Sequence, residues 1–152
     1  MSQKDHIEIL HEHTESLENA LKWLKRSLDI CKQYSLDHLS PEAMDAYEGL
    51  TSRFARVCDI LFNKLFRTIF FLEQGEAGTW LDMLLFMEKE NVIDNTKEAR
   101  LLKELRNDIV HEYAVNDLHI IFREVMDQSP LLLHYASQAF LKVEELNQKL
   151  KD

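Results

Sequence analysis

The amino-acid sequence predicts an all-α protein, an up-and-down bundle of five or six helices. Three glycines and two prolines occur among 152 residues, so few positions break a helix. Apolar residues recur at intervals of three and four along most of the chain, whereas the alternation typical of strands never extends beyond a few residues. The length fits one domain, residues 1–152, with enough chain to bury a core.

The first helix is expected from about Asp5 to Tyr34. Its inward-facing residues repeat with alternating steps of three and four, which is the pattern of a heptad seam. They are Ile7, Leu10, Thr14, Leu17, Leu21, Leu24, Leu28 and Cys31. A seam of this kind packs along one partner helix, which is either the second helix of the same chain or the same helix of a second subunit.

A second helix is expected to begin at Pro41. Ser40 can accept hydrogen bonds from the free amides, Pro41 suits the first helical position, and Glu42 favours the positive end of the helix dipole. This helix stops before Gly75, and its last part is apolar almost all round. The residues concerned are Leu61, Phe62, Leu65, Phe66, Ile69, Phe70, Phe71 and Leu72. Such a segment is either buried centrally or also contributes to a dimer interface, and the interface is the favoured interpretation.

Two shorter helices are expected after the loop at 75–79. Thr79 with Asp82 three residues later is a start signal for the first of them. Asn95 or Thr96 then caps the next helix, which continues into the polar stretch described below.

The last third of the chain contains one or two helices. Asn116 and Asp117 predict the cap of a new helix. Ser129-Pro130 then caps or kinks into a final helix that reaches about Leu150. The bundle has six helices if the break at Pro130 is complete, and otherwise five.

The charge distribution bears on the kind of partner. A net charge of -9 argues against a protein that coats nucleic acid, because phosphate affinity normally needs a basic surface. Two local strips are positive nevertheless. Arg53, Arg56, Lys64 and Arg67 have only Asp59 among them, and Lys97, Arg100, Lys103 and Arg106 outnumber Glu98 and Glu104. These strips suit either a short stretch of RNA or ordinary solvated helix faces.

Several classes of protein are disfavoured. No apolar run reaches the roughly 18 residues of a membrane span, and the N-terminus lacks a secretory pattern, so we expect a cytoplasmic protein without a membrane partner. Cys31 and Cys58 lie in apolar stripes, which suits reduced core thiols. His6, His11 and His13 lack further ligands at a suitable spacing, so solvated histidines are expected rather than a metal site.

One polar stretch lies at the end of an apolar-periodic helix, from Arg106 to Tyr113, with the sequence RNDIVHEY. In a helix, Arg106 and Tyr113 share one face, and Asn107 and His111 share a second. Arg106 and His111 diverge by about 140° around the axis, so one helix cannot easily direct both to a small target. Two copies related by a two-fold axis can, because the Arg and His of each then face a common groove.

This string resembles the Arg-x4-His-x-Tyr signature, with Asn after the Arg, of the HepT-like branch of the HEPN proteins, small all-helical domains often encoded beside a minimal nucleotidyltransferase. Length and helix layout agree over nearly the whole chain, and the specific match covers eight residues. The resemblance implies a HEPN-like domain that is a homodimeric, metal-independent endoribonuclease toxin without a cofactor. It also implies an RNA substrate, with tRNA as one candidate, and a cognate nucleotidyltransferase antitoxin that AMPylates Tyr113. Some relatives are described only as substrate-binding partners of nucleotidyltransferases.

The residue types suit metal-free RNA cleavage. An imidazole exchanges protons near neutral pH, so His111 is the candidate general base or acid. Arg106 offers a charged planar fork to phosphate oxygens, and Asn107 can orient His111 or bond the phosphate. A structural alternative is a polar dimer seam in which Arg106 pairs with Glu112 or Asp108 of the other chain.

Overall fold

The computed structural model describes residues 2–111 and 117–152, and every element in these ranges is helical. The elements are α1 (Gln3–Cys31), α2 (Pro41–Cys58), the π-helix η1 (Asp59–Leu65), α3 (Phe66–Gln74), α4 (Trp80–Lys89), α5 (Thr96–Val110) and α6 (Leu118–Lys151). Because α2, η1 and α3 follow one another without a break, they form one rod, and the described chain has five helical rods. The predicted all-α class is confirmed. None of the helices described is long and apolar enough to cross a membrane.

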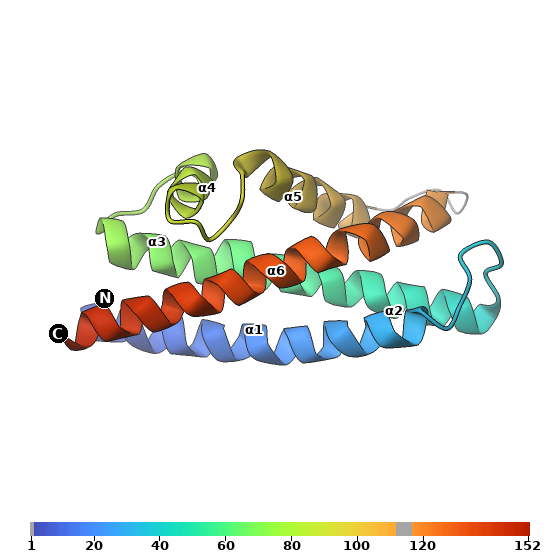
Figure 1. Ribbon diagram of the computed structural model, residues 1–152, viewed down its shortest axis with the longest axis horizontal. Coiled ribbons are helices and arrows are strands. Elements are labelled where there is room, and N and C mark those ends of the chain that lie inside the picture. The colour runs from blue at the N-terminus through green and yellow to red at the C-terminus, as the bar shows by residue number, and fades with distance from the viewer. Residues whose placement is uncertain (1, 112–116) are drawn as a thin grey trace.

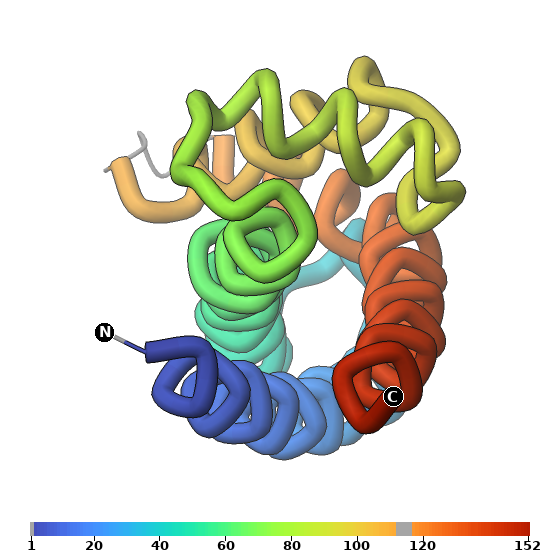
Figure 2. Tube along the Cα trace, turned by 90° about the vertical axis from the view of Figure 1, so that its left-hand side faces the viewer, coloured from blue at the N-terminus to red at the C-terminus, as the bar shows by residue number. Residues whose placement is uncertain are grey.

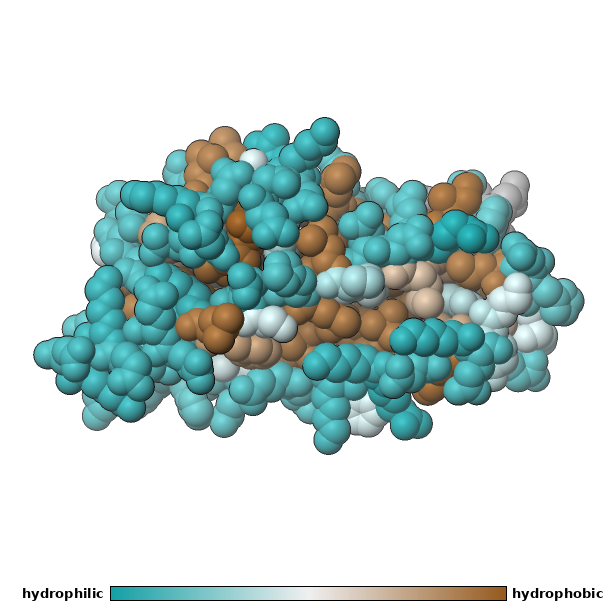
Figure 3. Space-filling model, in the orientation of Figure 1, coloured by the Kyte–Doolittle hydropathy of each residue, from teal (hydrophilic) through white to brown (hydrophobic). Residues whose placement is uncertain are grey.

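Helices α1, α5 and α6 and the α2–α3 rod run up and down roughly along the long axis, whereas the short α4 lies across it (Figure 1 and Figure 2). Chain direction reverses from α1 to the α2–α3 rod, and again from α5 to α6. Seen end-on, α1, the rod and α6 surround a shared core, while α4 and α5 lie together on one side of it (Figure 2). On the face shown in Figure 3, both ends are hydrophilic and apolar side chains reach the surface in the middle.

Helix α1 is tied down at both ends. Its first turn has a capping box, in which Ser2 Oγ accepts from the Asp5 amide at 3.3 Å, so the helix begins slightly before the expected Asp5. It ends at Cys31 rather than Tyr34. The Tyr47 hydroxyl of α2 donates to the Cys31 and Tyr34 carbonyl oxygens at 3.1 and 2.9 Å. The seam of α1 packs against the α2–α3 rod of the same chain, which decides between the two predicted partners.

The α2–α3 rod begins as predicted, with Ser40 Oγ accepting from the Ala43 amide at 3.1 Å and Pro41 at the first helical position. It ends at Gly75, whose φ of 75° is the left-handed conformation that glycine adopts without strain. Its apolar stretch is covered by the other helices of the same chain. Leu61, Leu65, Phe66 and Ile69 are fully buried, and Phe70, Phe71 and Leu72 are half-buried. This pattern therefore gives no argument for an interface between two chains.

Helix α6 is continuous through Pro130, so of the two predicted alternatives, five helices and six, the described chain has five. Ser129 is fully buried, and its hydroxyl donates to the Val125 carbonyl oxygen at 2.6 Å, one turn back. Side chains on both sides of Pro130, including Val125 and Leu132, are buried in the core. Packing over many residues outweighs the backbone hydrogen bond that proline removes.

A buried ion cluster joins α6 to α3 and to the end of α4. Lys142 Nζ lies 3.1 Å from Glu73 Oε1 and 2.9 Å from Glu90 Oε1, and the Lys142 side chain is 4% exposed. Lys149 Nζ bonds the other oxygen of Glu73 at 3.0 Å. We refer to these four residues as the Lys142 cluster. It fixes the small α4 region against the long helices.

Candidate functional site

Helix α5 positions the motif. Asn95 is its N-cap, accepting from the Glu98 amide at 2.8 Å, and Leu102 and Leu105 bury one face against the bundle. The helix ends at Val110. His111 follows as an extended C-cap residue whose amide donates to the Asn107 carbonyl oxygen at 3.1 Å. The described part of the motif therefore ends at His111, and Glu112 and Tyr113 lie outside the described residues.

Arg106 is held by an aspartate that the sequence did not identify as its partner. Its Nε and Nη2 donate to the two carboxylate oxygens of Asp59 at 2.6 and 3.0 Å, and Nη1 donates to Asn107 Oδ1 at 3.2 Å. The Arg106 and Asp59 side chains are 29% and 36% exposed. Hydrogen bonding to Asp59 raises the pKa of Arg106 above its ordinary value. Within this chain the guanidinium is therefore already paired, and the alternative pairing with Asp108 or Glu112 of another chain stays a prediction.

A small cleft of about 100 Å³ opens beside Arg106. It is lined by Cys58, Asp59, Phe62, Asn63, Trp80, Lys103, Arg106 and Asn107. Lys103 Nζ lies 4.2 Å from the centroid of a Trp80 ring, a cation–π contact. A guanidinium paired with a carboxylate, an ammonium, two amides and an indole ring thus surround one space. The ammonium, the amides and the free N–H groups of the guanidinium can bind an anion next to a planar group.

His111 lies at a different hollow. Its side chain is exposed at the edge of a cleft of about 320 Å³. The other lining residues are Glu48, Thr51, Ile109, Leu118, Ile121 and Phe122. No described residue lines both this cleft and the Arg106 cleft. One chain therefore does not bring Arg106 and His111 to one point, as the helical geometry predicts.

A third hollow lies between these two clefts, with a volume of about 690 Å³, and we call it the Arg56 groove. It is lined by Ser16, Thr51, Ser52, Ala55, Arg56, Asp59, Ile60, Lys64, Ile109 and Val110. Asp59 also lines the Arg106 cleft, while Thr51 and Ile109 also line the His111 cleft. The three hollows adjoin around the contact of α5 with the α2–α3 rod.

The π-helix η1 was not predicted. Asp59 is its first residue, so the bidentate partner of Arg106 sits where the rod changes its hydrogen-bonding pattern. Short π segments are frequent at functional sites. The sequence does hold one signal for Asp59, because it is the single acid within the basic stretch from Arg53 to Arg67.

No group of three or more potential metal-binding side chains occurs in the part of the chain that the structure describes. Cys31 and Cys58 are buried free thiols. Burial raises the pKa of Cys31 to about 11 and also raises that of Cys58, so both stay protonated near neutral pH. Neither thiol is therefore a ready nucleophile or metal ligand.

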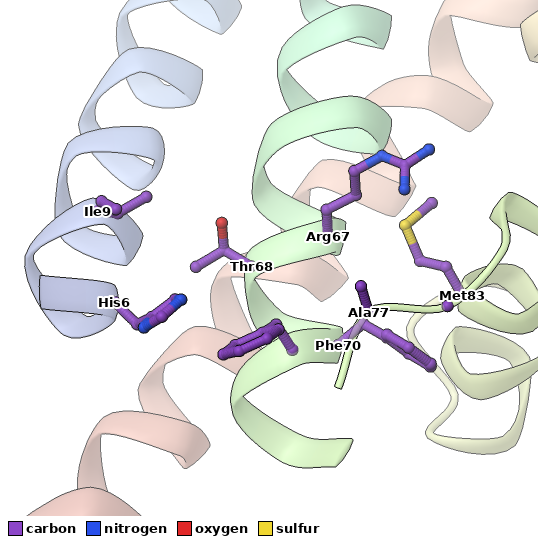
Figure 4. Close-up of a pocket in the computed structure, with 9 residues that line it drawn as sticks. His6, Ile9, Arg67, Thr68, Phe70, Ala77 and Met83 are labelled. Atoms are coloured by element: carbon purple, nitrogen blue, oxygen red, sulfur yellow. The ribbon is translucent and has the colours of Figure 1, made fainter. Parts of the chain in front are cut away.

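The N-terminal histidines make packing contacts that the sequence did not predict. His6 stacks on Phe71 at a centroid distance of 4.3 Å, and His13 Nδ1 lies 3.2 Å from Thr68 Oγ1. His6 also lines a pocket of about 250 Å³ between α1, α3 and the start of α4, with Met83 on the far side (Figure 4). None of the lining residues belongs to α5, so this pocket is separate from the motif.

Comparison of the chain with protein-family models, with curated proteins and with solved structures found no match. The fold and the site define an all-helical bundle with a polar motif at the end of one helix. A function for this bundle therefore rests on the side chains of α5 and their surroundings.

Proposed function

We propose that this chain is a metal-independent endoribonuclease toxin that acts as a homodimer and is inhibited through AMPylation of Tyr113 by a cognate minimal nucleotidyltransferase. The proposal starts from the resemblance of RNDIVHEY to the HepT-like motif. The observation that supports it most is the bidentate hold of Asp59 on Arg106, which keeps a half-exposed guanidinium oriented at a polar cleft. At the end of the same helix, His111 is exposed.

The hydrogen bonds of Arg106 leave it capacity for a phosphate. A guanidinium has five N–H donors, of which Asp59 takes two and Asn107 takes one. The remaining two are available to hold charge on a phosphorane, with the orientation already fixed. His111 would take the proton of the ribose 2′-hydroxyl or supply one to the leaving oxygen. Neither step requires a metal ion.

The homodimer supplies the convergence that one chain lacks. Arg106 and His111 of one chain line separate clefts, so a joint site pairs the arginine of one copy with the histidine of the other. Val110 and Ile120 are large apolar side chains, 50% and 49% exposed, that lie close to His111 in the chain. They suit a contact between copies. Sedimentation at micromolar concentration should show a dimer, and a monomer would count against the joint site.

The central test is RNA cleavage by the purified chain in EDTA. Wild type should cleave, and His111→Ala should cleave about a hundredfold more slowly, the usual loss for a proton-transfer group. His119→Ala is a matched control, because His119 is also an exposed histidine but lies outside the motif. A requirement for divalent metal, or equal rates for His111→Ala and wild type, would reject the mechanism.

The AMPylation step is tested separately, by incubating the chain with ATP and the nucleotidyltransferase encoded beside it. The intact mass should rise by whole AMP units, and RNA cleavage should stop, because AMP on the motif tyrosine would add negative charge and bulk to the motif. Tyr113→Phe should stay unmodified. Equal modification of Tyr113→Phe would place the acceptor elsewhere.

A non-catalytic, substrate-binding partner of a nucleotidyltransferase is the second candidate. One observation favours it: Asp59 already neutralises Arg106 within the chain, which is the arrangement of a structural ion pair. This candidate predicts a stable complex with the nucleotidyltransferase in size-exclusion chromatography and no RNA cleavage in EDTA. Cleavage by the chain alone would exclude it.

A further inference from the structure

The Arg56 groove has the chemistry of a phosphodiester site. Arg56 and Lys64 are exposed, and no carboxylate among residues 2–111 and 117–152 forms an ion pair with either of them. The one carboxylate in its lining, Asp59, is bonded by Arg106. Ser16 and Ser52 add hydroxyl groups to the lining. Two free cations with hydroxyl donors form a set that binds phosphate oxygens.

The local charge of this groove is opposite to that of the whole protein. The chain carries a net charge of -9, so an unspecific attraction for nucleic acid is not expected. Among the described residues, Asp59 is the one carboxylate that lines the groove, and it is already paired with Arg106. The described lining therefore has no further negative charge to balance Arg56 and Lys64. A short anionic chain would therefore bind here in preference to most of the surface.

An exposed aromatic ring, Trp23 of α1, lies beside Arg53 of α2 and lines a separate hollow with Lys22, Lys25 and Arg26. Arg53, three residues before Arg56, lies with Cζ 5.1 Å from the Trp23 ring centroid and donates to Ser27 Oγ at 2.7 Å. Trp23 is 45% exposed. A tryptophan held by a guanidinium offers a rigid face on which an unpaired base can stack. Unpaired bases are a property of single strands, which distinguishes this surface from one that binds a duplex.

We infer that the Arg56 groove binds the backbone of single-stranded RNA, with Arg56 and Lys64 on successive phosphates and Trp23 under a base. The inference rests on the proposed ribonuclease function for the choice of RNA. Its geometry fits that function, because the groove shares Asp59 with the Arg106 cleft and Ile109 with the His111 cleft. A strand in the groove would adjoin both clefts of its own chain, each of which contributes to a joint site with a second copy.

The test is binding of a fluorescent 2′-O-methyl RNA oligonucleotide, which lacks the hydroxyl needed for cleavage, measured by anisotropy over a range of salt concentrations. Arg56→Ala and Lys64→Ala should each weaken binding severalfold and reduce the slope of log K against log salt by about 0.7. Trp23→Leu should weaken binding about tenfold without changing this slope. Arg100→Ala and Lys89→Ala are matched controls, since both cations are exposed and neither lines the groove.

The outcomes separate this inference from the ribonuclease proposal. Binding that depends on Arg56 and Lys64, without cleavage of ordinary RNA, would support the groove and reject the nuclease. Cleavage with unchanged affinity and salt slope in both variants would overturn the groove, as would wild type that does not bind the oligonucleotide. A changed sedimentation coefficient with unchanged RNA binding would also overturn it, because the groove would then be an interface between copies. Because both side chains are exposed, the variants should keep the circular dichroism spectrum of wild type.

Discussion

Among the ion pairs that join distant helices in the part of the chain that the structure describes, Lys142–Glu73 and Arg106–Asp59 differ in depth. In the Lys142 cluster, the Lys142 and Glu73 side chains are 4% and 9% exposed. In the motif pair, Arg106 and Asp59 are 29% and 36% exposed, although the contact distance is shorter. The first pair is closed to any ligand, whereas the second keeps part of the guanidinium accessible. Burial, rather than contact distance, thus distinguishes an ion pair that only joins helices from one whose guanidinium stays accessible to a ligand.

The electrostatics of the two pairs follow the same division. Burial opposes the charge on Lys142, but hydrogen bonds to Glu90 and Glu73 outweigh it and raise the pKa of Lys142. Removing one partner would leave buried charges uncompensated, which is costly. For Arg106, the solvent can replace much of what Asp59 supplies. The Lys142 cluster should therefore govern stability, and the Arg106 pair should govern activity.

The largest expected effect comes from Lys142→Met. It leaves the carboxylates of Glu73 and Glu90 without their shared ammonium, and the free energy of unfolding should fall by about 3 kcal/mol. Urea denaturation followed by circular dichroism measures the change. Lys149→Met is the control, because the Lys149 side chain is 67% exposed and its loss should cost less than about 1 kcal/mol. Equal costs for the two variants would contradict the distinction by depth.

Arg106→Ala should lower RNA cleavage strongly and stability only slightly. RNA cleavage should fall about a hundredfold, equivalent to about 2.7 kcal/mol of transition-state stabilisation, while the free energy of unfolding changes by about 1 kcal/mol or less. Initial rates in EDTA and urea denaturation measure the two quantities. Arg100→Ala, an exposed arginine on the same helix, should alter neither. A large loss of stability in Arg106→Ala would assign the pair a structural role instead.

Asp59→Asn should have a smaller effect on activity. The amide keeps the shape of the carboxylate but loses its charge and one acceptor oxygen, so the guanidinium of Arg106 is held less firmly. Cleavage should fall about tenfold with little change in substrate affinity, because the loss concerns orientation. Full activity in Asp59→Asn would show that Arg106 needs no such support.

The smallest expected effect is on the pH dependence of the free energy of unfolding in acid. Burial opposes ionisation of Glu73, but hydrogen bonds from Lys149 and Lys142 outweigh it and keep the pKa of Glu73 below its ordinary value. The ionised carboxylate thus contributes stability above about pH 4.3, and this contribution is lost as the pH falls toward the folded-state pKa. In Lys142→Met, the rise of the free energy of unfolding with pH over this range should be shallower, because Glu73 loses one of the two ammonium groups that lower its pKa. Urea denaturation at several acidic pH values gives the free energy of unfolding of wild type and of Lys142→Met. The same pH dependence in both proteins would contradict the prediction.

Features set by neighbouring residues were predicted well from the sequence. The caps at Ser40, Thr79 and Asn95 are confirmed, because each depends on a side chain and an amide three residues away. The sequence also predicted that Arg106 and His111 diverge, and the two line separate clefts, although His111 follows α5 in an extended conformation. Both features depend on residues a few positions apart, and the sequence gives these spacings directly.

Features set by distant residues were missed or left open. Asp59 and Arg106 are 47 residues apart, and nothing in the sequence specifies which of several nearby helices brings an acid to that arginine. Whether the chain breaks at Pro130 was left open by the sequence, because packing against the core, which outweighs one lost hydrogen bond, depends on residues of other helices. Tyr113 lies outside the described residues, so its role stays a prediction.

The π segment at 59–65 makes the length of the second rod adjustable at one place. Its hydrogen bonds span five residues instead of four, so it accommodates one residue more than a regular α-helix. Deleting exposed Asn63 would let the segment become α-helical while α2 and α3 keep their faces toward the core. Deleting a residue at the start of α3 would instead turn every later side chain by about 100°, bringing Ile69 toward solvent. We therefore expect a one-residue deletion in this rod to be tolerated best next to Asp59, where it would alter the hold on Arg106 and leave the rest of the bundle folded.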